Sequence, residues 1–225
     1  MKGLKYKTFG GLLFLFIEMA TSLFLPAWTL DYREAWVFLA VFFFPVLAIT
    51  LYLAKRDPKL LERRVKAGPI AEKERSQKGI QLLATIAFIM IFIVSALDHR
   101  FSWSVVPMFV VAAGDIFVAI GLLVVFLVFK ENSFASATIE VGSEQTLVST
   151  GPYAFVRHPM YFGAFVMLTG TPLALGSWWG LLSVIPIVGV IIWRLLDEEV
   201  FLEKNLPGYT TYRNRVKYRL LPFIW

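Results

Sequence analysis

The chain has 225 residues, of which 58% are hydrophobic and only 17% are charged. A soluble domain of this length could not cover so much apolar surface, so the composition predicts an integral membrane protein. The absence of cysteine excludes disulfides, zinc–thiolate sites and thiol nucleophiles. The net charge of +6 comes from basic residues beside apolar stretches, which favours anionic membrane lipids over nucleic acid as the partner.

Four apolar stretches in the first half are predicted to cross the membrane as helices. About 20 apolar residues in a helix span a hydrocarbon core of roughly 30 Å. The expected spans are Phe9–Leu30, Trp36–Ala54, Gly79–Leu97 and Ser104–Phe129. The first is too long for a signal peptide and lacks a small-residue cleavage site, so we expect it to be retained.

Two acidic residues, Glu18 and Asp115, lie within these apolar stretches. Because a charge that faces lipid is costly, both should face the interior of the bundle. Between the second and third spans, residues 55–78 form a segment rich in lysine and arginine, predicted to be a cytoplasmic loop. Within it, Asp57-Pro58 predicts a short helix over Lys59–Lys66, before a break at Gly68-Pro69. Residues 1–129 are thus expected to form four transmembrane helices with one basic loop.

Residues 130–225 have a different organisation. Lys130–Val156 is polar and is expected to lie against the membrane rather than through it. Pro159–Leu175 and Trp178–Trp193 predict two apolar helices in a tight hairpin, each slightly short for a full span. The second helix is expected to continue to about Lys204, where Asn205–Gly208 ends it.

Basic residues are distributed very unevenly among the connections. Twenty of the 22 lysines and arginines lie in the N-terminal tail, residues 55–78, residues 130–157 and the chain from Arg194 onward. The two remaining connections hold one each, Arg33 and Arg100. The positive-inside rule therefore predicts a multi-pass protein with both termini in the cytoplasm. The predicted fold class is all-α, a polytopic bundle of about six transmembrane helices whose last two form a tight hairpin.

Two polar clusters on the predicted cytoplasmic face are candidates for chemistry. The first contains Arg157, His158 and Pro159 at the start of the hairpin, and the second contains Arg194, Glu198 and Glu199 near its end. Arg194 and Glu198 are four residues apart, so they share a helix face and can form an ion pair. Each cluster by itself also fits an ordinary interfacial helix end with a snorkelling arginine or a first-turn proline.

Other familiar motifs are absent from the sequence. It has no dinucleotide-binding glycine motif, Walker loop, His-Glu-x-x-His helix or serine elbow. His99 and His158 do not resemble a pair of metal ligands, so no metal site is predicted. Any nucleotide-like ligand must be held outside a dinucleotide-binding domain.

The two clusters lie within longer motifs that resemble the isoprenylcysteine carboxyl methyltransferase family, which is related to phospholipid N-methyltransferases. The first motif runs from Gln145 through Gly151-Pro-Tyr153 to Arg-His-Pro-x-Tyr-x-Gly at 157–163. The second comprises Arg194, Glu198-Glu199-x-x-Leu202, Gly208-Tyr209-x-x-Tyr212-x-x-Arg215-Val216 and Leu221-Pro222-Phe223. The resemblance covers residues 130–225 closely and the first half only in hydropathy, which makes 130–225 the expected catalytic region.

The resemblance implies S-adenosylmethionine as the methyl donor, bound in a pocket at the cytoplasmic face. It implies that Arg194 and Glu198 are catalytic and align the methyl acceptor, and that Tyr209 and Tyr212 close a lid. The residues implied to bind the cofactor are Gln145, Leu147, Val148, Gly151, Tyr153, Arg157, His158, Pro159, Tyr161, Glu199, Tyr209 and Tyr212. Eukaryotic members of the family usually have histidine where this chain has Gln145, and an amide cannot titrate.

The implied activity is methyl transfer to a hydrophobic or lipid-borne acceptor, with a carboxylate favoured over an amine. A carboxylate is already anionic at neutral pH, and an arginine can hold it by two parallel hydrogen bonds. A phospholipid N-methyltransferase is the alternative, and a sterol-type membrane reductase is a more distant one. A transporter or membrane scaffold is an alternative of another class, although its site should lie near the membrane midplane.

Overall fold

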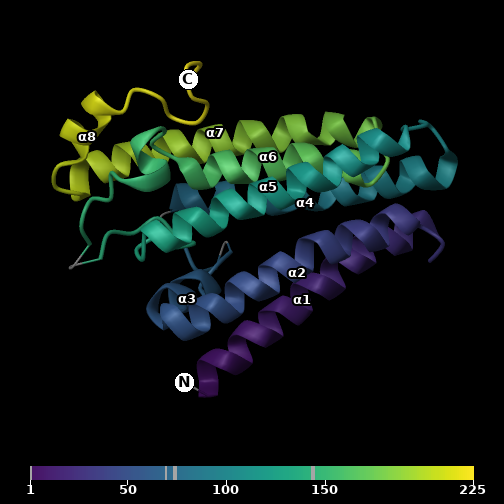
Figure 1. The fold of residues 1–225 in the computed structure, drawn as a ribbon, viewed down its shortest axis with the longest axis horizontal. Coiled ribbons are helices and arrows are strands. Elements are labelled where there is room, and N and C mark those ends of the chain that lie inside the picture. Colours follow the sequence, from purple (N-terminus) through teal and green to yellow (C-terminus); the bar gives the residue numbers. More distant parts are fainter. Residues whose placement is uncertain (1, 69, 73–74, 143–144) are drawn as a thin grey trace.

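The computed structural model describes residues 2–68, 70–72, 75–142 and 145–225. In this part of the chain every regular element is a helix, which confirms the predicted all-α fold class (Figure 1). The elements are α1 (Lys2–Ala27), α2 (Arg33–Arg56), α3 (Pro58–Val65), α4 (Arg75–Phe101), α5 (Met108–Glu131), the 3-10 helix η1 (Gly151–Ala154), α6 (Pro159–Ala174), α7 (Trp179–Asn205) and α8 (Tyr209–Arg215).

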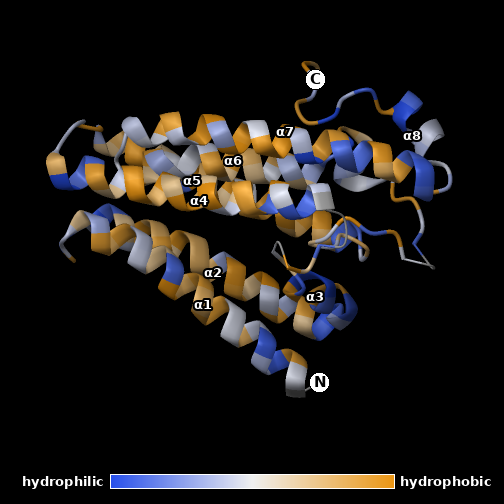
Figure 2. Ribbon diagram, turned by 180° about the vertical axis from the view of Figure 1, so that it is seen from behind, coloured by the Kyte–Doolittle hydropathy of each residue, from blue (hydrophilic) through white to orange (hydrophobic). Residues whose placement is uncertain are grey.

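Five helices in the described residues, α1, α2, α4, α5 and α7, are long and apolar enough to cross a membrane. The sixth expected span, α6, has 16 residues and a length of about 24 Å, so it falls short of a complete crossing. Figure 2 shows hydrophobic residues along the long helices, whereas α3 and α8, at one end of the bundle, are largely hydrophilic. We call this end the polar end. The prediction of a polytopic helical membrane protein is confirmed.

The second half of the bundle is held together by unusually close contacts between α5 and α6. Gly121 faces Gly163 across this interface, and a Cβ atom added to Gly121 would lie 2.5 Å from the Gly163 carbonyl oxygen. Because glycine has no side chain, the two backbones can approach at this point. This contact holds the start of α6, which carries the Arg157–Gly163 motif, firmly against α5.

The α1–α2 pair packs beside the remaining helices and is tied to them at the end of the bundle remote from α8. Tyr32, in the connection between α1 and α2, is fully buried and donates a hydrogen bond to the Leu175 carbonyl oxygen at 2.6 Å. The Tyr32 ring also stacks on His99, with 3.8 Å between ring centroids. The hydrogen bond connects the α1–α2 turn to the turn of the α6–α7 hairpin, and the stacking connects it to the end of α4.

The short helix predicted in the basic loop is confirmed as α3. The Asp57 carboxylate accepts a hydrogen bond from the Leu60 backbone N–H at 2.9 Å, and Pro58 occupies the first turn. After α3, Gly68 adopts a positive φ of 92°, a backbone conformation that glycine allows and that interrupts the helix as predicted. Pro69 lies outside the described residues.

Several predicted boundaries were wrong because hydropathy marks lipid contact rather than helical conformation. α1 already begins in the basic tail and ends at Ala27, before Trp28 turns the chain with φ 59°. α4 extends beyond both ends of the predicted span Gly79–Leu97, to Arg75 and Phe101, so the basic loop before it is shorter than expected. α5 begins at Met108 rather than Ser104, because Pro107 precedes it in an extended conformation.

Both intramembrane acids are half-buried. Glu18 lines an internal cavity, as expected for an acid that faces the bundle interior, and accepts a hydrogen bond from Ser22 Oγ at 3.3 Å. One carboxylate oxygen of Asp115 is buried and has no hydrogen-bond partner among the described residues.

Candidate active site

One continuous cavity of about 800 Å³ extends from the polar end into the apolar interior. Near the polar end it is lined by the segment after α5, by α8 and by the facing ends of α6 and α7. Deeper in the bundle its walls are mainly apolar and include Phe14, Phe42 and Phe88 from α1, α2 and α4, with Glu18 as an acidic exception. The cavity therefore combines a polar compartment with an apolar one, as a polar ligand beside a lipid-like ligand requires.

The structure brings most of the predicted site residues to this cavity. All of them except Gly151 and Glu199 line it: Gln145, Leu147, Val148, Tyr153, Arg157, His158, Pro159, Tyr161, Arg194, Glu198, Tyr209 and Tyr212. Residues nearly 70 positions apart thus form one wall. Gly151 adopts φ 56° at the start of η1, and Glu199 lies behind His158.

Tyr161, Arg194 and Glu198 form the polar centre of the cavity. The Tyr161 hydroxyl donates to Glu198 Oε2 at 2.6 Å and accepts from Arg194 Nε at 3.1 Å. The direct Arg194–Glu198 ion pair predicted from their spacing is not formed. The tyrosine hydroxyl connects them instead, because the rest of the guanidinium is engaged by partners from the first half of the chain.

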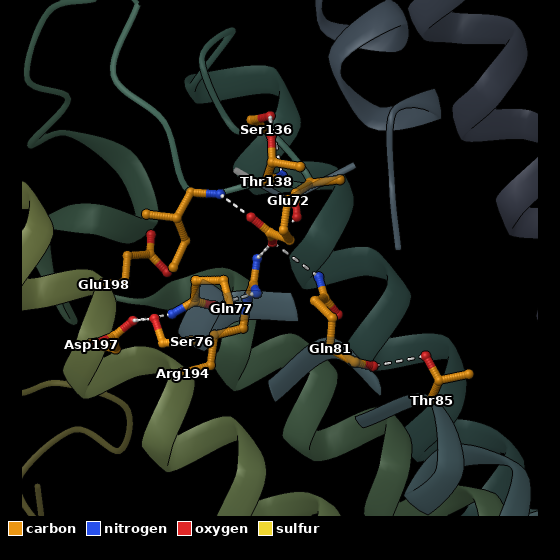
Figure 3. Close-up of polar contacts among 12 residues, drawn as sticks. Glu72, Ser76, Gln77, Gln81, Thr85, Ser136, Thr138, Arg194, Asp197 and Glu198 are labelled. Atoms are coloured by element: carbon orange, nitrogen blue, oxygen red, sulfur yellow. Dashed lines mark hydrogen bonds and ion pairs between the residues drawn. The ribbon is translucent and has the colours of Figure 1, made fainter. Parts of the chain in front are cut away.

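Those partners are Glu72 and Gln77, which sequence analysis did not identify. Arg194 Nη2 donates to Glu72 Oε1 at 2.7 Å, and Arg194 Nη1 donates to Gln77 Oε1 at 2.7 Å (Figure 3). Nη2 also donates to the Ala137 carbonyl oxygen at 3.0 Å. Sequence analysis expected Arg194 to hold an acceptor carboxylate by two parallel hydrogen bonds. That bidentate contact would require Glu72 to move away from the guanidinium.

The Glu72 side chain is completely buried, although it comes from the basic segment predicted to be a cytoplasmic loop. It also accepts hydrogen bonds from Gln81 Nε2 at 3.4 Å and from the Ile139 backbone N–H at 3.3 Å. Gln77, at the start of α4, in turn donates to the Asp197 carboxylate on α7. Figure 3 shows Glu72 between Arg194 and Gln81, so that α4 and α7 are joined through this acid.

A second charged cluster centres on Glu199, which is buried. Its Oε1 accepts from Arg157 Nε at 2.6 Å and lies 3.2 Å from His158 Nε2, while its Oε2 accepts from Arg219 Nε at 2.9 Å. Arg157 Nη1 also donates to the Val216 carbonyl oxygen at 2.8 Å. This cluster fixes the Arg-His-Pro motif and the C-terminal segment behind the cavity wall.

Tyrosine side chains surround the polar compartment. The Tyr212 hydroxyl donates to the Tyr153 carbonyl oxygen at 2.8 Å, and Asn132 Nδ2 donates to the Tyr153 hydroxyl at 2.9 Å. Burial raises the pKa of Tyr153 to about 12 and raises the pKa values of Tyr209 and Tyr212 well above their ordinary value. These phenols are therefore neutral hydrogen-bonding groups, and the Tyr209 hydroxyl is buried without a partner among the described residues.

Gln145 lines the cavity at the position where the resemblance placed it. Its side-chain Oε1 accepts a hydrogen bond from the Gly142 backbone N–H at 3.2 Å, which fixes one side of the amide. Within the described ranges, no cluster of three or more histidine, aspartate or glutamate side chains is placed to hold a metal ion.

This chain is similar to a methyltransferase family and to a curated methyltransferase. Residues 109–207 match the model of the phospholipid methyltransferase family. Over 79 residues, 32% of the chain, the sequence is 29% identical to protein-S-isoprenylcysteine O-methyltransferase of Schizosaccharomyces pombe. The matched region covers 32% of that relative's length, about a third. The two matches confirm the predicted family resemblance over the parts of the chain that they cover.

Proposed function

We propose that this chain, which is similar to these methyltransferases over part of its length, transfers a methyl group from S-adenosylmethionine to a hydrophobic or lipid-borne acceptor. The observation that carries the proposal is the continuous cavity, polar at one end and apolar at the other, with Tyr161, Arg194 and Glu198 where the two parts meet. Two ligands of opposite polarity could meet there without either leaving its preferred environment.

The polar compartment fits S-adenosylmethionine in the chemistry of its side chains. When bound, this donor supplies a methyl group on a positively charged sulfur, which leaves as a neutral thioether. Glu198 offers a negative charge toward a sulfonium, while His158, Gln145 and the neutral tyrosines offer hydrogen bonds to polar groups. Glu199 contributes from behind the wall, where it holds Arg157 and His158 in place, and Gly151 contributes the turn that begins η1.

A carboxylate acceptor fits the polar centre better than an amine does. A carboxylate is already deprotonated at neutral pH, so the chain has to align it and exclude water rather than remove a proton. Arg194 holds Tyr161 and Glu198 in a fixed arrangement at the meeting point, and thereby aligns the acceptor. The name of the Schizosaccharomyces pombe relative supports an isoprenylcysteine-like acid as the acceptor.

A phospholipid amine is the second candidate acceptor, and the phospholipid methyltransferase family match favours it. An amine must lose a proton before or during methyl transfer, so Glu198 would then serve as the base. Glu198 Oε2 already accepts the Tyr161 hydroxyl hydrogen bond at 2.6 Å, so this oxygen would have to release or share that hydrogen bond to take a proton from an amine. This contact favours the carboxylate acceptor.

We also propose that residues 130–225 form the catalytic region and residues 1–129 its membrane support, with both termini in the cytoplasm. The charge distribution supports this orientation, because the segments rich in lysine and arginine surround the polar end of the bundle. The donor would then enter from the cytoplasm, and the acceptor would enter from the membrane between helices.

The test is direct binding of S-adenosylmethionine to the purified protein, measured by calorimetry in detergent, together with transfer of labelled methyl to a prenylcysteine acid. We expect saturable binding, and we expect His158→Ala to weaken it. His99→Ala, at the far end of the bundle, is the control and should leave the affinity unchanged. A folded protein that binds no S-adenosylmethionine would contradict the proposed function.

A further inference from the structure

We infer that Arg64 is a carboxylate-binding residue of the cavity and holds the acid group of a bound ligand beside the polar centre. The identity of the two possible ligands, acceptor acid or methyl donor, rests on the proposed function. The arginines that line the cavity differ in whether a buried acid pairs with them.

Arg64 comes from α3, in the basic segment, and turns inward rather than toward solvent. Its Nη1 donates to the Ser136 carbonyl oxygen at 2.9 Å and lies 3.6 Å from Met160 Sδ. The guanidinium lies over the Phe129 ring, 5.1 Å from its centroid. Arg64 lines the cavity together with Met160, directly before Tyr161 in the chain.

Among the described residues, Arg64, Arg157 and Arg194 line this cavity, and the last two form ion pairs with buried acids. Arg194 is paired with Glu72 at 2.7 Å, and Arg157 is paired with Glu199 at 2.6 Å. Arg64 differs: within the described part of the chain, no carboxylate lies within ion-pair distance of its guanidinium. Its partners there are a carbonyl oxygen, a thioether and an aromatic ring, so no described acid balances its charge.

This charge persists at neutral pH. Burial, together with the like charge of Arg194, lowers the pKa of Arg64 to about 10, which leaves the guanidinium protonated under physiological conditions. A half-buried charge without an opposite partner is costly, and an anionic ligand in the cavity would relieve that cost. Nη1 is engaged, whereas Nε and Nη2 have no hydrogen-bond partner among the described residues and could make a two-point contact with a planar carboxylate.

Two ligands of the proposed reaction carry a carboxylate. One is the acceptor acid, and the other is the amino-acid portion of S-adenosylmethionine. Both would be recognised by the same fork of N–H donors. They are distinguished by removing the carboxylate from each ligand in turn, as the methyl ester of the acceptor and as 5′-methylthioadenosine in place of the donor.

The experiment compares Arg64→Gln with Arg63→Gln in the full-length protein in detergent. Arg63 lies on the same helix and donates to the Ser133 carbonyl oxygen at 2.6 Å, but it does not line the cavity. Dissociation constants are measured by calorimetry for N-acetyl-S-farnesylcysteine, its methyl ester, S-adenosylmethionine and 5′-methylthioadenosine. None of these measurements requires turnover.

We expect Arg64→Gln to weaken binding of one carboxylate ligand about tenfold or more, the effect of a hydrogen-bonded charge. Binding of the matching carboxyl-free compound should change less than about twofold, and Arg63→Gln should change neither. If Arg64→Gln weakens binding of the acceptor acid alone, Arg64 binds the carboxylate of the acceptor. If it weakens binding of S-adenosylmethionine alone, Arg64 binds the carboxylate of the donor. Arg64→Lys should recover part of the affinity because it retains the charge.

Two results would overturn the inference. One is unchanged affinity for both carboxylate ligands in Arg64→Gln. The other is an equal loss for a carboxylate ligand and its carboxyl-free counterpart, which would indicate a purely structural role. A wild-type protein that binds neither S-adenosylmethionine nor the acid would instead contradict the proposed function, and the inference about Arg64 would fail with it.

Discussion

Replacing Glu199 by glutamine tests whether the buried charged cluster behind the cavity holds the site together. The change keeps the shape of the side chain but removes the negative charge that Arg157, His158 and Arg219 share. Both Glu199 and Arg157 have side chains that are 5% exposed, so solvent cannot replace the lost charge. Breaking a buried ion pair on one side costs about 3–5 kcal/mol.

We take the lower value, about 3 kcal/mol, for Glu199→Gln, because the amide oxygen can still accept one of the hydrogen bonds. In a protein of this size, each kcal/mol shifts the melting temperature by about 2–4 °C, so the expected decrease is about 6–12 °C. The measurement is thermal unfolding followed by tryptophan fluorescence in a single detergent. S-Adenosylmethionine binding should weaken as well, since His158 and Arg157 lose their support.

Glu203→Gln is the matched control, one turn further along α7. Glu203 pairs with Arg213 at 2.6 Å, but their side chains are 31% and 41% exposed. An exposed ion pair contributes about 0–1 kcal/mol, so the melting temperature should fall by less than about 4 °C. Equal shifts for the two variants would refute the conclusion that the Glu199 cluster is a buried structural centre.

Three further predictions concern packing, alignment and topology. Gly121→Ala should lower the melting temperature, because the added methyl group would lie 2.5 Å from the Gly163 carbonyl oxygen. Gly189→Ala is the control and should not lower it, because no described atom beyond the local helix backbone lies within 4 Å of the added methyl group. Thermal unfolding measures both variants. Arg194→Ala should reduce turnover about 100-fold while the dissociation constant for S-adenosylmethionine changes only a few-fold, as kinetics and calorimetry would show. A cysteine at Lys66, in this otherwise cysteine-free chain, should react with an impermeant maleimide only from the cytoplasmic side, and labelling from outside would contradict the proposed orientation.

Much of the fold could be predicted from the sequence because the membrane imposes a simple rule. A helix must satisfy its own backbone in lipid, so long apolar stretches such as those of α2 and α5 mark spans reliably. The rule does not locate helix ends, which depend on local capping. Asp57-Pro58 supplied a readable cap for α3, whereas the extension of α4 to Arg75 and Phe101 lies in polar sequence that lipid does not constrain.

Much of the cavity wall could also be predicted, because its residues lie in two motifs with fixed internal spacing. The contacts of Arg194 could not be predicted, because Glu72 and Gln77 are more than 100 residues away in the sequence and only the fold brings them close. One signal was nevertheless present. Gln77, Gln81 and Thr85 repeat every four residues, which places a polar stripe on one face of an otherwise apolar helix.

The partners of Arg194 have a consequence for the region that matches known methyltransferases. That region, residues 109–207, contains Arg194, Tyr161 and Glu198 but neither Glu72 nor Gln77. Without Glu72, the Arg194 guanidinium would be left in a largely buried position without its acid, a severely unfavourable state. The polar centre therefore requires the turn before α4 and the start of α4 as well as the motifs of the second half. The first half of the chain completes the site electrostatically, in addition to supplying the apolar walls of the cavity.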